Sequence, residues 1–209
     1  MSKTTFVTAL IFVITIGAAV IFVWTSVHAL WYAPDSEISV PSSTVPVTSQ
    51  KSTNLTTVSP GDKPTRLLIP ALDVDAHIQH VGINAKGNMA VPSNFTDVAW
   101  YEYGPVPGYL GSAVIAGHVD NGLGLSGVFK RLKEIKAGDD IYIDTESGQH
   151  LHFVVRDVES YPYKDVPMEQ IFAQNDKPRL NLVTCTGSWV KGDKTYDHRL
   201  VVYTELVES

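Results

Sequence analysis

Hydrophobic positions in this 209-residue chain change their pattern along its length, beginning with a long apolar run. From Thr4 to Pro34 there is no Asp, Glu, Lys or Arg, and FVTALIFVITIGAAVIFVW is almost continuously apolar. A transmembrane helix needs about 20 apolar residues, whereas the apolar region of a signal peptide has about 7–15. We therefore predict an uncleaved membrane anchor in residues 1–32, with Lys3 on the cytoplasmic side. A cleaved signal peptide is the alternative, because residues 27–29 (VHA) resemble a cleavage site.

The next segment, residues 33–64, has neither the period of a helix nor the alternation of a strand. It is rich in Ser, Thr, Pro and Val and carries little charge. Such a composition cannot bury a hydrophobic core, so it predicts an extended, disordered stalk. The stalk would hold the domain that follows, residues 65–209, away from the membrane.

Residues 65–209 contain short β-branched and aromatic runs separated by turn signals such as NAKGN, KAGDD and ESGQ. The runs are RLLIPAL, VDAHIQHV, SAVIAGHV, DIYIDT, LHFVVRDVESY, LNLVTC and RLVVYTEL. Seven or eight strands in about 145 residues predict an all-β barrel or sandwich. Two short helical pieces are expected, in GVFKRLKEI (127–135) and in PMEQIFAQ (167–174).

Charge and cysteine content exclude several classes of protein. The net charge of −6 leaves no basic stripe for phosphates, so we expect no nucleic-acid partner. A single cysteine, Cys185, permits neither an internal disulfide nor an all-cysteine metal site. His150 and His152 lie two apart on one predicted strand face, but no third ligand is obvious nearby, so we expect no metal site.

Three polar side chains stand at the ends of apolar strands. His118 follows SAVIAG, Cys185 follows LNLVT, and Arg199 precedes LVVYTEL. A thiolate, an imidazole and a fixed cation suffice for acyl transfer without a cofactor or a metal. Spacing alone does not show that the three converge. An inert, buried Cys185 is the competing interpretation, and His198 is an alternative imidazole.

The contexts of these residues resemble the sortase family. LVTCTG is similar to the strand end that carries the sortase cysteine, AGHVD resembles the histidine segment, and RLVVYTEL resembles the arginine strand. The resemblance covers essentially residues 64–209. The segment MAVPSNFTDVAWYEYGPVPGYLGSAVIAGHVD is most similar to class F sortases. One departure is Asn181, which stands where many sortases carry Thr.

The resemblance implies an eight-stranded closed β-barrel with short helices and the activity of a cysteine transpeptidase. By this resemblance Cys185 is the nucleophile, which cleaves a Leu-Pro-x-Thr-Gly-like sorting signal after its threonine. His118 acts as general acid and base, and Arg199 holds the substrate or the oxyanion. Thr184 matches a position whose neighbourhood contributes to the oxyanion site. Residues 161–177 match the loop that shapes the substrate groove.

The implied partners are secreted proteins with a C-terminal sorting signal and an amine acceptor, such as a peptidoglycan precursor. With the predicted anchor, the catalytic domain would face the cell wall from a single-pass position in the cell membrane. Two further readings stay open: the same site acting mainly as a peptide hydrolase or pilin polymerase, and a non-catalytic wall-binding or partner-binding β-module. Asp120, two residues after His118, either orients that histidine or is a solvated loop residue, and it is not among the predicted catalytic residues.

Overall fold

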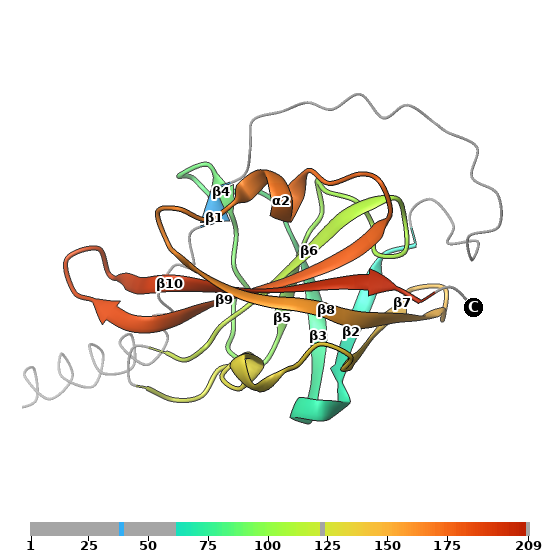
Figure 1. Cartoon of the computed structure of the whole chain (residues 1–209), viewed down its shortest axis with the longest axis horizontal. Helices are drawn as coiled ribbons and strands as arrows, with labels where there is room; N and C mark the ends of the chain where they lie inside the picture. The colour runs from blue at the N-terminus through green and yellow to red at the C-terminus, as the bar shows by residue number, and fades with distance from the viewer. Residues whose placement is uncertain (1–37, 40–61, 122–123, 208–209) are drawn as a thin grey trace, which may run out of the picture.

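The computed structural model describes residues 38–39, 62–121 and 124–207, which form ten strands and three short helices (Figure 1). The strands are β1 (Ile38–Ser39), β2 (Pro64–Ile69), β3 (Val74–Val81), β4 (Asn88–Met89), β5 (Val98–Tyr101), β6 (Gly111–Gly117), β7 (Asp140–Thr145), β8 (His150–Pro162), β9 (Pro178–Val190) and β10 (Thr195–Leu206). The helices are the 3₁₀ helices η1 (Pro70–Leu72) and η2 (Leu132–Glu134) and the α-helix α2 (Met168–Phe172).

Eight of these strands close into a barrel in the order β10-β8-β7-β2-β3-β5-β6-β9. The pairs β3–β5 and β6–β9 are parallel, and the other neighbours are antiparallel. The long hairpin of β9 and β10 extends beyond the barrel at the left of Figure 1. The predicted all-β, eight-stranded closed barrel is therefore confirmed.

The burial pattern distinguishes strands whose outer face is exposed to solvent from strands whose outer face is covered. In β7 the burial alternates along DIYIDT, because one face points into the barrel and the other toward solvent. In β6 all seven residues are buried, and so are residues 180–185 of β9 and 199–204 of β10. These three strands are neighbours in the order β6-β9-β10. Their outer face must therefore be covered by other parts of the chain.

The outer face of these strands is covered in a second hydrophobic cluster outside the barrel, which we call the outer cluster. Its buried members from the strands are Met89, Val114, Ala116, Val183, Val201 and Tyr203, and Ile171 of α2 joins them. Asn181, which is fully buried, donates from Nδ2 to the carbonyl oxygen of Ile171 over 2.7 Å. This bond fixes α2 to β9. The helix predicted in residues 167–174 is thus confirmed, and it lies over the outer face of the sheet (Figure 1).

The helical piece expected in residues 127–135 is shorter than predicted. Only residues 132–134 form a 3₁₀ helix, and turns precede it. The backbone N–H groups of Lys130, Leu132 and Glu134 donate to carbonyl oxygens three residues earlier, which is the pattern of tight turns and not of an α-helix. Gly127 also lies so close to His118 that an added Cβ would be 2.3 Å from its carbonyl oxygen. Packing against the segment that carries His118 has overridden the local helical pattern.

The predicted anchor, residues 1–32, lies outside the described residues. In the part of the chain that is described, no helix has the length and apolar character needed to span a membrane. Within the predicted stalk, β1 pairs antiparallel with β4. The barrel domain begins with a fixed residue: Asp62 is 6% exposed and accepts hydrogen bonds from the backbone N–H and the hydroxyl of Ser147, at 2.8 and 2.6 Å.

Candidate active site

Cys185 and Arg199 lie directly opposite each other on β9 and β10. In an antiparallel pair, residues in register point to the same face with their Cβ atoms about 4.5–5.5 Å apart. The register holds along this stretch, since Leu200 faces Thr184 and Val201 faces Val183. The Cα–Cβ bonds of Cys185 and Arg199 therefore leave the sheet side by side, on the same face.

His118 comes to the same place from the other neighbour of β9. Strand β6 runs parallel to β9, with Ala116 opposite Val183, and His118 is the first residue after β6. Continuing this register by two residues leads from Val183 to Cys185 and from Ala116 to His118. The hydroxyl of Thr184 donates to the carbonyl oxygen of Gly117 over 2.8 Å, so the two strands are still adjacent at this point.

All three side chains belong to the outer face of the barrel. Ala116, Val183 and Val201 are members of the outer cluster. His118, Cys185 and Arg199 are each two positions from one of them, and alternate residues of a strand share a face. The three predicted residues thus converge at one end of the outer cluster, and each is only 1% exposed.

The imidazole of His118 is held from two sides. Its Nε2 lies 3.0 Å from the carbonyl oxygen of Pro92, and its ring centroid is 5.2 Å from that of Phe95. A carbonyl oxygen can only accept, so Nε2 carries the proton in this bond. In the neutral imidazole, Nδ1 is then the nitrogen without a proton.

The guanidinium of Arg199 is fixed by its own strand. Nη1 donates to the carbonyl oxygens of Tyr196 and His198, at 3.0 and 3.1 Å, and Nη2 donates to Oγ1 of Thr195 at 2.9 Å. The ring of Tyr163, in the segment that follows β8, lies 5.7 Å from the guanidinium carbon. Nε is buried and has no hydrogen-bond partner among the described residues. Arg199 therefore keeps one buried donor for a group that enters the site.

His198 does not compete for the role of His118. It adjoins Arg199 on β10, so its side chain points to the opposite face of the strand. Its Nδ1 lies 2.8 Å from Oδ1 of Asp197, and it is partly exposed. Of the two histidines considered from the sequence, the structure places His118 beside Cys185.

The side chain of Thr184 faces the barrel interior, in line with Leu180 and Leu182, and its hydroxyl is bonded to Gly117. Its contribution to an oxyanion site stays a prediction. What the structure adds is a link between the residue before Cys185 and the residue before His118. Asn181, the departure noted in the sequence, lies four residues before Cys185 and faces α2, where its side chain bonds to the Ile171 carbonyl oxygen.

Two residues that were not among the predicted catalytic residues also belong to this region. Asp120 is 6% exposed, so it is not a solvated loop residue. Both of its carboxylate oxygens lie 2.7 Å from the hydroxyl of Tyr196. The proximity of Asp120 to His118 was visible in the sequence, but no signal pointed to Tyr196.

The histidines considered for a metal site have separate partners on the far side of the barrel. Nδ1 of His150 lies 2.5 Å from Oδ1 of Asp144, and Nε2 of His152 lies 2.7 Å from Oδ1 of Asp140. The ring of Tyr142 is stacked against both imidazoles, with centroids 4.8 Å apart in each case. Within the described residues no group of three or more His, Cys, Asp and Glu side chains could hold a metal ion.

Known proteins resemble this chain at the level of the domain. Residues 67–207 match the family model described as Sortase domain. No match was found among curated protein sequences.

Solved structures of several sortases share the fold. Sortase C-1 from Actinomyces oris is 23% identical, with a TM-score of 0.55 over 69% of this chain and 74% of that chain. A lid mutant of sortase A from Corynebacterium diphtheriae is 22% identical, with a TM-score of 0.54 over 70% of each chain. A Clostridium perfringens sortase D5 transpeptidase is 20% identical, with a TM-score of 0.52 over 72% of this chain and 82% of that chain.

Proposed function

Because this chain belongs to the sortase family and is a cysteine transpeptidase of that family, we propose that Cys185, His118 and Arg199 transfer the acyl part of a sorting signal to an amine. The observation that carries this proposal is the placement of the three side chains on one outer face, with Cys185 and Arg199 in register. The substrate would be a Leu-Pro-x-Thr-Gly-like signal, cleaved after threonine.

In the first half of the reaction, Sγ of Cys185 attacks the threonine carbonyl carbon as a thiolate. A C–S bond forms and the carbonyl π electrons move to oxygen, giving a tetrahedral oxyanion. When the C–N bond breaks, the imidazolium of His118 gives a proton from Nδ1 to the leaving glycine nitrogen. The product is a thioester on Cys185, and His118 is left neutral.

In the second half an amine attacks the thioester carbon. His118 now accepts a proton at Nδ1, and the C–S bond breaks to release the thiolate of Cys185. The new amide carries the acyl group, and both catalytic side chains return to their starting protonation states. Water in place of the amine would give hydrolysis by the same steps.

Arg199 supports both halves electrostatically. A fixed cation beside a thiol favours the thiolate, and in a buried site it stabilises an oxyanion strongly. The guanidinium is already held by three hydrogen bonds, so no side-chain reorganisation is needed when charge develops. Its buried Nε–H is the donor that suits the substrate oxygen.

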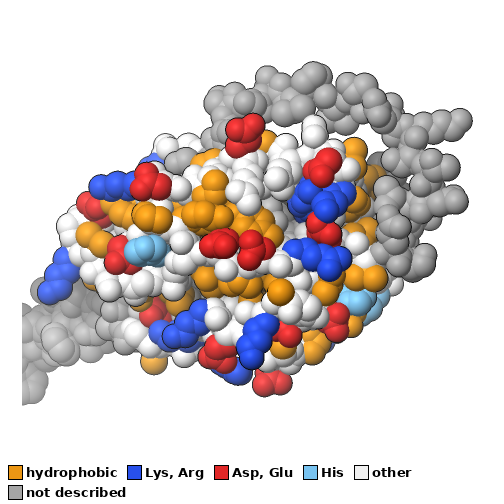
Figure 2. Space-filling view, in the orientation of Figure 1, with side chains coloured by type: hydrophobic (Ala, Val, Ile, Leu, Met, Phe, Trp, Pro, Cys, Tyr) orange, Lys and Arg blue, Asp and Glu red, His pale blue; other side chains and the backbone are white. Residues whose placement is uncertain are grey.

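Partly buried hydrophobic residues packed against the outer cluster, among them Tyr161, Val166 and Met168, would contact an extended peptide with apolar side chains. On the face shown in Figure 2, hydrophobic side chains run across the middle with acidic side chains among them, and charged side chains of both signs lie around this band. We further propose a class F-like, membrane-anchored enzyme that acts on secreted proteins at the cell wall. The support for this part is the sequence pattern of residues 89–120 and of the apolar segment in residues 1–32.

The decisive experiment follows a fluorogenic Leu-Pro-x-Thr-Gly peptide, with and without an amine, by kinetics and mass spectrometry. The wild-type chain should form a thioester adduct, and the added amine should appear in the product. Cys185→Ala should keep the fold by circular dichroism and lose the adduct and all turnover. Full activity of Cys185→Ala would refute the assignment. Product without the amine would identify a hydrolase, and no adduct in the wild type would favour a binding module.

A further inference from the structure

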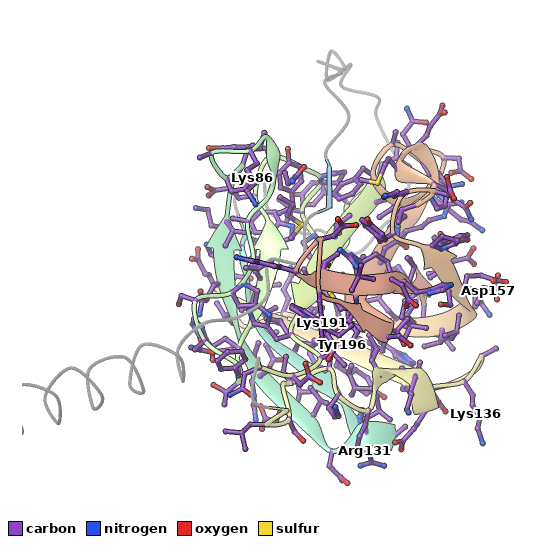
Figure 3. All side chains as sticks on the ribbon, turned by 90° about the vertical axis from the view of Figure 1, so that its left-hand side faces the viewer. Lys86, Arg131, Lys136, Asp157, Lys191 and Tyr196 are labelled. Carbon is purple, nitrogen blue, oxygen red and sulfur yellow. The ribbon has the colours of Figure 1, made fainter. Side chains whose placement is uncertain are left out.

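Asp120 and Tyr196 join two segments that are far apart in the sequence and meet beside the active site. Asp120 lies just after β6 and forms an isolated antiparallel bridge with Ser126, whereas Tyr196 lies near the start of β10. The Tyr196 hydroxyl is 2.7 Å from both oxygens of Asp120. The second partner of this carboxylate is Nζ of Lys130, 3.0 Å from Oδ2. In Figure 3, Tyr196 lies near the middle of the view.

Each member of this pair is connected to a proposed catalytic residue through its own backbone. Asp120 is two residues after His118, and the intervening turn is pinned by the bond from the Gly127 N–H to the Val119 carbonyl oxygen. The carbonyl oxygen of Tyr196 accepts the hydrogen bond from Nη1 of Arg199 at 3.0 Å. The hydroxyl–carboxylate bond therefore ties the segment that holds His118 to the segment that holds Arg199.

The surroundings of Tyr196 favour a stable hydrogen bond from its hydroxyl to the Asp120 carboxylate. Burial and then the hydrogen bond and negative charge of Asp120 raise the pKa of Tyr196 well above its usual value, and Cys185 contributes in the same direction. The phenol therefore stays a neutral donor throughout the physiological pH range. A buried carboxylate without such partners would be costly.

We propose that Asp120 and Tyr196 are positioning residues that fix His118 relative to Arg199 and Cys185. The inference builds on the proposed roles of those three residues. Neither Asp120 nor Tyr196 need touch the substrate. Small misplacements of catalytic groups reduce the rate of the chemical step much more than substrate binding. The link should therefore affect kcat, while the hydrophobic residues around α2 that would contact the peptide are left intact.

The test compares Tyr196→Phe, Asp120→Ala and the double variant in the full 209-residue chain, solubilised in a mild detergent. Each single variant should lower kcat about ten-fold and change KM less than two-fold. The double variant should be no slower than the singles, because all three lose the same bond. Asp120→Asn keeps an acceptor oxygen without the charge, so it should retain near-wild-type kcat.

Tyr142→Phe is the matched control, since Tyr142 lies on β7, away from the site, and should behave as wild type. Wild-type kcat in Tyr196→Phe would overturn the inference, as would multiplicative effects in the double variant. A larger change in KM than in kcat would overturn it as well, and equal losses in Asp120→Asn and Asp120→Ala would assign the effect to charge instead of position. Cys185→Ala in the same assay separates the two proposals, because its inactivity supports the transpeptidase site whatever Tyr196→Phe does.

Discussion

The hydroxyl of Thr184 donates to the carbonyl oxygen of Gly117 over 2.8 Å, and this bond links the residue before Cys185 to the residue before His118. It lies in the barrel interior, so it acts from beneath the outer face that carries the thiol. The position of the thiol relative to the imidazole therefore depends on a hydroxyl on the opposite side of the sheet.

Thr184→Val should lower both stability and activity. The variant keeps the shape of the side chain and leaves the buried Gly117 oxygen without this donor, at a cost of about 1–2 kcal/mol in the free energy of unfolding. Thr204 offers a matched control, because its hydroxyl makes a similar buried bond to the Leu180 oxygen, at 2.7 Å, near the other end of β9. Thr204→Val should lose similar stability without a fall in kcat. Equal losses of kcat in the two variants would contradict this positional role.

Arg199→Lys should reduce kcat/KM by about 100-fold or more, although the positive charge is retained. An ammonium group cannot reproduce the three hydrogen bonds of the planar guanidinium together with its free Nε–H. Steady-state kinetics with the fluorogenic peptide would measure the change. Arg66→Lys, on the exposed face of β2, is the control and should leave kcat/KM unchanged. A lysine at position 199 that supports normal turnover would show that charge alone is sufficient.

Asn181→Ala should weaken substrate binding more than it slows the chemical step. The substitution removes the donor to the Ile171 oxygen, so α2 loses its anchor to β9. We expect a loss of about 1–3 kcal/mol in the free energy of unfolding and a several-fold rise in KM for the peptide. Denaturant unfolding and peptide kinetics would test both effects. If kcat fell while KM stayed constant, Asn181 would belong to the catalytic geometry and not to the substrate groove.

Asp62 should make the stability of the barrel depend on acid pH. Burial opposes ionisation of Asp62, but the hydrogen bonds from Ser147 and Thr145 together hold its pKa below the ordinary value of 3.8. The stabilisation is therefore fully present above about pH 5 and is lost as the pH falls through the lowered pKa.

Asp62→Asn should consequently be less stable than wild type by about 1 kcal/mol at pH 7, and the difference should shrink below pH 3.8. Urea unfolding at several pH values measures this difference. Ser147→Ala, which removes one donor to the same carboxylate, should show the same pattern with a smaller amplitude. A difference that is independent of pH would contradict the assignment.

Several features could be predicted from the sequence because they depend on local pattern. The β-branched and aromatic runs predicted the strands. The limits of these runs placed His118, Cys185 and Arg199 at strand ends. The resemblance of the three contexts to one family then linked these residues. The helix predicted in residues 127–135 is shorter in the structure, because Gly127 is packed against the backbone of His118 and the following N–H groups bond three residues back.

The tertiary structure decided which strands became neighbours, and with that which side chains meet. Strand β6 pairs with β9, whose facing residues lie 67 positions later in the chain (Ala116 faces Val183), and no local pattern encodes that register. The same is true of the bond between Asp120 and Tyr196, whose positions are 76 apart, and of the separate carboxylate partners of His150 and His152. Local propensity acts over a few residues, whereas closure of the barrel sets contacts over the whole chain. The sequence by itself determined the chemical groups, and only the closed barrel determined their geometry.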